Sequence, residues 1–420
     1  MPKGKQMDVN KDKSVQPQKP KKVVVEKSAL FESIIESFEN DKELKEIVNK
    51  VHAHVDIIPT GITPLDLASG GGIGVGVFTQ IAGDEGVSKT STVLQIIGNL
   101  QKRYGDKLVV VYLDTEYSLD EKRVAQLRAD YGSMIYSTPN TIEKVFGYVN
   151  KIINIAKEQE FKKKGIITLV VWDSLASTDT EKVNVAESLS DVASEMGARA
   201  RLLGVALRKY LGDLKDNNIS MIIINQNRDV LNVGNPFLAK FGKKVTQPGG
   251  KAPKFAFYQM INLSVVERDK ENGKQNVSFE LEKNKNFVPF VKSVGVFDYT
   301  AGFVEPLSFL YFAKKNNFMK FSGGLEFSLK KYSEEFEQLY GSPYEKIKSE
   351  REFASKYIKD AKFKDAIDSF WKNHFKETIK VGDNFYSNLL SGIDVSQEDI
   401  EQSTENEEEK SETGTNSDLE

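Results

Sequence analysis

The chain has 420 residues, of which 39% are hydrophobic and 28% charged, with a formal net charge of −3 and no cysteine. Such a composition is ordinary for a soluble globular protein with one large domain and smaller appendages, and the absence of cysteine excludes disulfides, thiolate metal ligands and thiol chemistry. Because no apolar stretch approaches the roughly 20 residues that cross a bilayer and the N-terminus lacks the apolar core of a secretory signal, we expect a cytoplasmic protein.

The N-terminal part of the chain divides into two predicted segments. Residues 1–27 carry eight lysines among Gln, Pro and Asn, which predicts a disordered basic arm. In the segment 28–55, apolar residues such as Leu30, Ile34 and Phe38 recur at helical spacing after Ser28, a residue suited to an N-cap. This pattern predicts an amphipathic helix ahead of the core.

Residues 56–327 alternate between strand-like and helix-like runs, which is the pattern of parallel βαβ units. The predicted strands are Val77–Ala82, Leu108–Leu113, Ile167–Trp172 and Met221–Ile224, and the predicted helices begin near Lys89 or span Ile142–Phe161 and Gly197–Asp216. The last three strands are almost continuously apolar, as expected for strands covered on both faces. After Gln259 the pattern alternates, which predicts antiparallel strands that extend the sheet.

The C-terminal part is predicted to contain a small domain and a tail. Residues 328–395 are rich in lysine and aromatic residues and have a helical pattern, which predicts a small α-rich domain. Residues 396–420 are dominated by Glu and Asp, with Lys410 as the only base from Glu398 onward. This composition predicts a disordered acidic tail.

A phosphate-binding loop is predicted between the first strand and the first helix of the core. The segment 83–90, Gly-Asp-Glu-Gly-Val-Ser-Lys-Thr, matches the pattern G-x-x-x-x-G-K-[ST] except that Ser88 stands where the second glycine belongs. In such a loop backbone N–H groups cradle phosphates, Lys89 neutralises their charge and the Thr90 hydroxyl reaches Mg²⁺. The alternative is an ordinary turn before a helix. The predicted nucleotide contacts are Gly83, Asp84, Glu85, Gly86, Val87, Ser88, Lys89, Thr90 and Ser91.

Three further strand ends carry polar side chains suited to a nucleotide site. Asp173 ends a buried strand, where it could hold Mg²⁺ or simply cap the following turn. Glu116 follows another strand, and a carboxylate there could orient and deprotonate the water that attacks a γ-phosphate. A third strand delivers Gln226, whose neutral amide could sense that phosphate. Because open α/β sheets bind ligands at the carboxyl edge of their strands, we expect these side chains to converge.

At this point the chain resembles the RecA-type recombinases, in particular the bacteriophage UvsX-like branch. The resemblance covers about residues 28 to 303. Its motifs, in family order, are the run Thr60–Asp66, the loop Gly83–Thr90, Leu113–Asp120, Val171–Ser174, Ile224–Arg228, Gly249–Phe255 and Glu282–Lys285. The fold it implies is a RecA-type P-loop ATPase core with a mostly parallel sheet flanked by helices, an antiparallel extension, an N-terminal oligomerisation segment and a C-terminal α-rich domain.

The resemblance also implies roles for individual residues, with ATP and Mg²⁺ as cofactors. Glu116 resembles the catalytic glutamate, acting beside Lys89, and Gln226 the nucleotide sensor. Asp120 and Tyr299 resemble the adenosine contacts. Lys283 and Lys285 resemble the pair that reaches the ATP of a neighbouring subunit, so that ATP would lie at subunit interfaces of a head-to-tail helical filament. The 28–55 helix would dock on the next subunit, or alternatively pack on its own core.

Two loops would bind single-stranded DNA, as in recombinases of this type. Cations that meet phosphates and apolar groups that slip between bases suit this task. The residues are Met196, Gly197, Arg199, Arg201 and Arg208 for the first loop, and Arg228, Lys240, Phe241, Lys243, Lys244, Gly249, Gly250 and Lys251 for the second. The C-terminal domain could gather duplex DNA. The acidic tail either solubilises the chain or competes with DNA for basic surfaces.

The resulting prediction is a DNA-dependent ATPase that forms filaments on single-stranded DNA and catalyses homologous pairing and strand exchange in recombination, repair and recombination-dependent replication. Its expected partners are single-stranded DNA, homologous duplex DNA and further copies of itself, with single-strand-binding and mediator proteins as further candidates and no membrane. If the chain is phage-encoded, the compartment is the cytoplasm of a bacterial host. The alternatives are a ring-shaped DNA helicase on the same core and a non-catalytic ATP-binding regulator.

Overall fold

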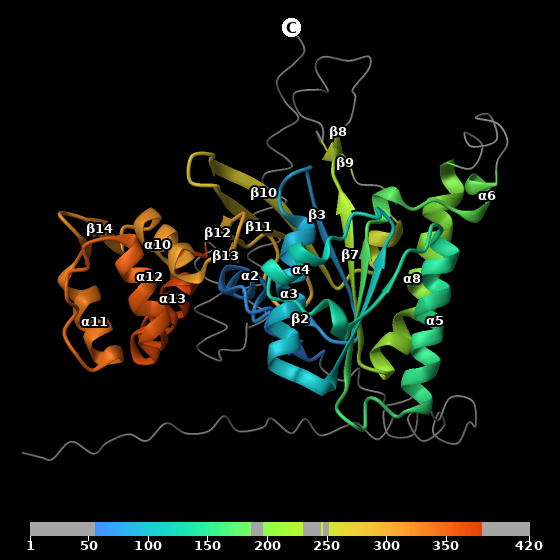
Figure 1. The fold of residues 1–420 in the computed structure, drawn as a ribbon, viewed down its shortest axis with the longest axis horizontal. Helices are drawn as coiled ribbons and strands as arrows, with labels where there is room; N and C mark the ends of the chain where they lie inside the picture. The colour runs from blue at the N-terminus through green and yellow to red at the C-terminus, as the bar shows by residue number, and fades with distance from the viewer. Residues whose placement is uncertain (1–54, 186–195, 230–244, 247–251, 380–420) are drawn as a thin grey trace, which may run out of the picture. The chain divides into compact units, whose positions relative to one another are not determined.

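The computed structural model describes residues 55–185, 196–229, 245–246 and 252–379 (Figure 1). The predicted basic arm and acidic tail therefore lie outside the described residues, as does the predicted N-terminal helix apart from its last position. Most of the second predicted DNA-binding loop also lies outside them. Among the described residues, no helix has the length and apolar character required to span a membrane.

A nine-stranded sheet forms the centre of the described structure, with the strand order β13-β12-β11-β10-β3-β7-β6-β4-β5. Strands β10, β3, β7, β6, β4 and β5 run parallel to one another, whereas β11, β12 and β13 extend the sheet beyond β10 by antiparallel pairing. The strands are β3 (Phe78–Gly83), β4 (Leu108–Asp114), β5 (Met134–Ser137), β6 (Ile167–Asp173), β7 (Ile219–Gln226), β10 (Gln259–Asp269), β11 (Lys274–Asn284), β12 (Lys292–Asp298) and β13 (Gly302–Phe303). The predicted fold class is confirmed.

The central strands are buried on both faces, which explains their continuous apolar sequences. Successive residues of one strand enter different cores: Val110 belongs to one hydrophobic cluster and Val111 to the other. The first cluster includes side chains of α3 (Lys89–Tyr104), and the second includes side chains of α5 (Ile142–Glu158) and α8 (Met196–Asp216). The sheet is therefore a layer between helices, with the carboxyl ends of its parallel strands at one edge.

One predicted helix end is wrong. The helix α5 stops at Glu158 rather than at Phe161, because Glu160 has a left-handed backbone with φ of 53°. The N–H groups of Glu160 and Phe161 then donate to Lys157 O and Ala156 O, which closes the helix end instead of continuing it. The predicted strand Met221–Ile224 is also too short at both ends, since β7 runs from Ile219 to Gln226.

Short elements connect the layers of the sheet domain. The helix α2 (Thr63–Ser69) ends at Gly70, whose positive φ of 79° suits glycine. The other short elements are β1 (Ile57–Ile58), β2 (Ile73–Gly74), α4 (Glu121–Gln126), α6 (Glu181–Asn184), β8 (Arg228–Asp229), β9 (Val245–Thr246) and the 3₁₀ turns Gly105–Lys107, Tyr131–Ser133, Leu175–Ser177 and Ala252–Phe255. The antiparallel pair β8–β9 forms the base of the second predicted DNA-binding loop.

Between residues 305 and 379, the described C-terminal part contains four helices and a hairpin around an aromatic core. Its elements are α10 (Glu305–Lys315), β14 (Met319–Phe321), β15 (Leu325–Phe327), α11 (Lys330–Tyr340), α12 (Glu350–Lys359) and α13 (Ala361–Thr378). Phe309 of α10 stacks on Phe353 at a ring distance of 5.9 Å, and Phe327 contacts Phe370 at 5.2 Å. Ser308 of the same α10 accepts a 2.9 Å hydrogen bond from the backbone of β12. Side chains on both sides of the predicted boundary at 327/328 thus share one core.

Candidate active site

The segment Gly83–Thr90 runs from the last residue of the buried strand β3 through a loop into the first turn of the helix α3, in the strand-to-helix context that the sequence predicts. A Cβ atom on Gly83 would lie 2.5 Å from Leu263 O, so only glycine fits where β3 passes β10. Gly86 and Ser88 both have left-handed backbones, with φ of 74° and 65°. Ser88 therefore occupies a conformation that glycine adopts far more readily. The free N–H groups of the α3 N-terminus follow directly, which is a favourable place for an anion.

Lys89 begins α3, and its ammonium group is held by the loop itself. The Nζ atom donates to Gly83 O at 3.0 Å and to Asp84 O at 2.6 Å. Burial lowers the pKa of Lys89, while the negative charges of Glu116 and Asp173 act in the opposite direction. An ammonium group in this position could exchange its carbonyl partners for the oxygens of a phosphate.

Asp173, at the end of β6, is directed at the phosphate-binding loop. Its Oδ2 atom accepts hydrogen bonds from Thr90 Oγ1 at 2.8 Å and from the buried Tyr112 hydroxyl at 2.7 Å. Burial raises the pKa of Asp173 to about 6, against the effect of these two hydrogen bonds, and the nearby Glu116 adds to the rise. The contact with Thr90 joins two separate motifs of the sequence and favours the interpretation of Asp173 as a site residue over a simple turn cap.

Thr90 and Asp173 together offer the oxygen ligands that Mg²⁺ prefers. Within the described part of the chain, no cluster of three or more His, Cys, Asp or Glu side chains could hold a metal ion. Magnesium beside phosphates needs no such cluster, because one or two protein oxygens, substrate phosphates and waters complete its shell. The residues present therefore fit a nucleotide-bound Mg²⁺, and a divalent charge would offset the cost of keeping Asp173 ionised.

Glu116 lies in a turn that Asp114 organises at the end of β4. The Asp114 carboxylate accepts from the backbone N–H groups of Glu116, Ser118 and Leu119, each at 3.0 Å. It is fixed in turn by the Tyr136 hydroxyl, also at 3.0 Å. Sequence reasoning missed Asp114, although an Asp at a strand end that accepts from the following N–H groups is a recognised turn signal.

The side chain of Glu116 is held by residues from two other strand ends. Its Oε1 atom accepts a hydrogen bond from Ser174 Oγ and a longer one of 3.3 Å from Gln226 Nε2. These donors fix one carboxylate oxygen, and among the described residues the other has no hydrogen-bond donor, so it is available to a water molecule. The three strand ends β4, β6 and β7 thus converge, as predicted.

The converging residues surround a cavity of about 460 Å³. Its polar surface comes from the loop, from the first turn of α3 and from the three strand ends. The lining residues are Glu85, Gly86, Val87, Ser88, Lys89, Thr90, Ser91, Glu116, Asp173, Ile224 and Gln226.

Asp120 and Tyr299, the predicted adenosine contacts, both hydrogen-bond to Arg123. Asp120 caps α4 and accepts from the backbone N–H of Arg123 at 2.9 Å. The Arg123 guanidinium donates to Tyr299 O at 2.6 Å and to Ser91 Oγ at 3.0 Å. Sequence reasoning missed Arg123, because its partner Tyr299 is distant in the chain.

Gln275, at the start of β11, is a second residue that sequence reasoning missed. Its Nε2 atom donates to Ser88 Oγ at 2.8 Å, and its Oε1 atom accepts from the Tyr299 hydroxyl at 2.9 Å. The residue is 1% exposed. An alternating strand offers no signal for such a contact, so only the structure reveals it.

Lys283 and Lys285, by contrast, are not brought to this cavity. In the β10–β11 pair, Lys283 lies opposite Met260, near the start of β10. Gln275 lies opposite Arg268, near the end of β10. At about 3.3 Å per residue, Gln275 and Lys283 lie roughly 25 Å apart along β11. Lys283 Nζ donates to Lys254 O at 2.7 Å and Phe255 O at 3.2 Å, and burial together with Lys285 lowers its pKa.

The residues predicted to bind DNA are described only in part. Arg201 and Arg208 are exposed on α8, which begins at Met196 and Gly197. Arg199 is turned toward the protein, where it donates to Leu175 O and pairs with Asp179 at 3.4 Å. Arg228 lies in β8, and its side chain is not described. Lys240, Phe241, Lys243, Lys244, Gly249, Gly250 and Lys251 lie outside the described residues.

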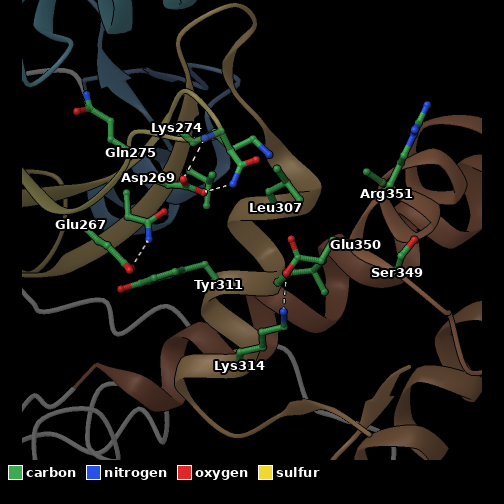
Figure 2. Close-up of a pocket in the computed structure, with 15 residues that line it drawn as sticks. Glu267, Asp269, Lys274, Gln275, Leu307, Tyr311, Lys314, Ser349, Glu350 and Arg351 are labelled. Atoms are coloured by element: carbon green, nitrogen blue, oxygen red, sulfur yellow. Dashed lines mark hydrogen bonds and ion pairs between the residues drawn. The ribbon is translucent and has the colours of Figure 1, made fainter. Parts of the chain in front are cut away.

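A larger cavity of about 840 Å³ lies between the β10–β11 hairpin and the helices α10 and α12 (Figure 2). Its charged side chains are mostly engaged with neighbours, as in the Lys314–Glu350 ion pair at 2.6 Å and the Asp269–Asn272 hydrogen bond at 2.7 Å. Figure 2 shows the amide of Gln275 directed away from Lys314 and Glu350. The smaller cavity has the convergent carboxylates and cation, so we assign the candidate active site there.

Much of the chain is similar in sequence to known proteins. A family model described as the RecA N-terminal domain matches residues 27–303. Protein RecA of Aquifex aeolicus (strain VF5) is 33% identical over 240 residues, which cover 56% of this chain and 64% of the relative. Protein RecA of Leifsonia xyli subsp. xyli (strain CTCB07) is 30% identical over 275 residues, covering 64% and 71%. The chain thus spans slightly less than two thirds of the Aquifex relative's length.

Proposed function

Because this chain belongs to the RecA family, we propose that it is a DNA-dependent ATPase that forms helical filaments on single-stranded DNA and catalyses homologous pairing and strand exchange. The observation that carries the proposal is the convergence of Lys89, Glu116, Asp173 and Gln226 on one cavity at the carboxyl edge of the sheet. The finer proposal of a bacteriophage UvsX-like branch is supported by the motif resemblance alone.

The geometry suggests a role for each residue in hydrolysis. Backbone N–H groups of the loop and of the α3 N-terminus bind the phosphates, and Lys89 exchanges its carbonyl partners for phosphate oxygens. Thr90 and Asp173 would hold Mg²⁺, which would supply positive charge to neutralise the phosphates. Glu116, oriented by Ser174 and Gln226, accepts a proton from the attacking water.

The contacts of Gln226 support a role in reporting the state of the nucleotide to the second predicted DNA-binding loop. Its side chain contacts Glu116, while its backbone N–H donates to Asn225 Oδ1 at 3.0 Å at the end of β7. The chain continues from this point into Arg228 and the second predicted loop. A γ-phosphate that engages the Gln226 amide would therefore act directly on the start of that loop.

The position of Lys283 and Lys285 supports a shared site between subunits. Neither lysine can reach the phosphates bound by its own chain, because they lie near the opposite edge of the sheet. A neighbouring subunit stacked head to tail would bring them to a second chain's nucleotide. ATP bound at such an interface favours the assembled state, and its hydrolysis loosens the filament.

The decisive experiment measures ATP hydrolysis with and without single-stranded DNA. We expect the wild-type rate to rise with single-stranded DNA and to fall to background in Lys89→Ala. Lys151→Ala, which removes an exposed lysine of α5, is the matched control and should behave as wild type. A hydrolysis rate that does not change when single-stranded DNA is added would contradict the proposal. Electron micrographs that show closed hexamers instead of filaments would favour a ring-shaped helicase.

A further inference from the structure

Ser88 departs from the phosphate-loop pattern, and its side chain has a defined place in the structure. The residue keeps the left-handed backbone, with φ 65° and ψ 33°, that a glycine would adopt there. It also lines the cavity that we assign to the phosphates. A serine in this position thus adds a hydroxyl group to the phosphate site at the cost of an unfavourable backbone conformation.

The hydrogen bonds of Gln275 determine how this hydroxyl group is used. Gln275 Nε2 is 3.4 Å from Gly86 O and 2.8 Å from Ser88 Oγ. Because a carbonyl oxygen can only accept, its proximity fixes which end of the amide faces the loop. The Tyr299 hydroxyl donates to the other end, Oε1, at 2.9 Å. Gln275 therefore donates to Ser88.

The hydroxyl group of Ser88 is consequently free to act as a hydrogen-bond donor to a ligand. A serine hydroxyl group has one hydrogen and accepts through its oxygen, and here the oxygen is occupied by Gln275. Among the residues that the structure describes, Ser88 Oγ makes no other hydrogen bond to protein. The cavity beside it is lined by Lys89 and the start of α3, both of which favour an anion.

We propose that Ser88 donates a hydrogen bond to a phosphate oxygen of the bound nucleotide and that Gln275 is the positioning residue that orients it. This inference rests on the proposed function and adds a residue to its site. The donors run in one direction, from Tyr299 to Gln275, from Gln275 to Ser88 and from Ser88 to phosphate. Tyr299, predicted to contact adenosine, then also influences how the loop holds phosphate.

The test measures the Kd of Mg·ATP and of Mg·pyrophosphate by calorimetry on the full chain. Ser88→Ala keeps a Cβ in the left-handed conformation and removes only the hydroxyl group. It should weaken both ligands about tenfold or more, since a hydrogen bond to a charged group is lost. Gln275→Ala should weaken both by about threefold to tenfold. Asn276→Ala, next in β11 but bonded to Glu267, is the matched control and should bind as wild type.

A double variant separates positioning from an unrelated structural effect. Ser88→Ala combined with Gln275→Ala should bind both ligands within about twofold of Ser88→Ala alone, because Gln275 acts through Ser88. Additive losses would overturn the proposal. Tyr299→Phe should weaken pyrophosphate, which has no adenosine, by about twofold to fivefold; unchanged pyrophosphate binding would remove Tyr299 from the chain of donors.

The controls keep this result distinct from failure of the proposed function. A wild-type chain that binds neither ligand would contradict the nucleotide site itself. Wild-type binding together with wild-type affinity in Ser88→Ala would overturn only the role of Ser88. If Ser88→Ala unfolds, Ser88→Gly replaces it, because glycine suits the left-handed backbone and also lacks the hydroxyl group. It too should lose affinity about tenfold for both ligands.

Discussion

The two ends of β11 differ in what their side chains contact. At the Gln275 end, side chains from the phosphate loop, β11 and the region after β12 hydrogen-bond to one another, and Ser88 among them lines the nucleotide cavity. At the Lys283 end, the lysine side chain is held by the backbone carbonyls of Lys254 and Phe255, far from any phosphate of its own chain. Under the proposed function, one end completes a nucleotide site within the chain, and the other would supply cationic groups to the nucleotide of a second chain.

The largest expected effect comes from a substitution in the part of the nucleotide site that one chain supplies by itself. Glu116→Gln should lower the hydrolysis rate by about 100-fold or more, because the amide cannot accept the proton of water. Binding of Mg·ATP should change little, since the proposed role of Glu116 is to act on the attacking water rather than to hold the phosphates. Steady-state rates and calorimetry test both statements, with Glu158→Gln on α5 as the control.

The opposite end is tested by Lys283→Ala combined with Lys285→Ala. This variant should lose about 100-fold in DNA-stimulated hydrolysis, as expected when a cation supplied in trans is removed. Its affinity for Mg·ATP as a free subunit should stay within about threefold of wild type. A loss of free-subunit affinity as large as the loss of rate would mean that these lysines act within their own chain.

A mixing experiment sharpens the same comparison. Lys89→Ala retains Lys283 and Lys285, whereas the double lysine variant retains the phosphate loop. If each active site combines two chains, a mixture of the two inactive proteins should recover a measurable part of the DNA-stimulated rate. A mixture as inactive as its components would contradict the shared site.

The second predicted DNA-binding loop follows β7 at the phosphate edge of the sheet. Lys243→Ala with Lys244→Ala should weaken binding to single strands of any sequence by about tenfold at moderate salt. The slope of log affinity against log salt should fall by about one to two, because fewer counterions are released. Salt titrations by fluorescence anisotropy measure both, and an unchanged slope would place the DNA elsewhere.

The smallest expected effect concerns the buried carboxylate at the phosphate edge. Burial raises the pKa of Asp173 from 3.8 to about 6 in the ligand-free chain. The stability contributed by its protonation is therefore fully present below pH 3.8 and is lost as the pH rises through about 6. Asn stays neutral at both pH values. The free energy of unfolding of Asp173→Asn should therefore rise by about 1 kcal/mol relative to that of wild type between pH 5 and pH 8.

Urea denaturation at pH 5 and pH 8, without Mg²⁺ or nucleotide, measures this difference. A constant difference between the two proteins would show that Asp173 titrates as an exposed carboxyl group. Addition of Mg·ADP should stabilise wild type more than Asp173→Asn at pH 8, because only the carboxylate carries a negative charge toward the metal.

The sequence predicts the parts of the site that repeat a local pattern. Gly83, Lys89 and Thr90 occupy fixed positions between a strand and a helix, and Asp173 follows an apolar strand. Because parallel strands end at one edge, their convergence follows from the topology. The α/β core is predictable for the same reason, since apolar runs and their alternation with helices are local signals.

The sequence does not predict contacts between distant, ordinary-looking residues. Gln275 lies 187 positions from Ser88, and Arg123 lies 176 positions from Tyr299. A glutamine in a strand or an arginine on a short helix gives no sign of its partner. The predicted end of α5 was wrong for a different reason. Glu160 has a left-handed backbone that its residue type does not favour.

The helix α10 carries a practical consequence for dissecting the protein. It hydrogen-bonds to β12 through Ser308 and packs Phe309 against Phe353 and Trp371 of the later helices. A chain cut after residue 327 would leave the large rings of Phe309, Phe312, Phe318 and Phe327 facing water, a patch that promotes aggregation. Isolated fragments of the C-terminal part should therefore begin before Glu305, and a soluble core fragment would need polar replacements on the exposed face of this helix.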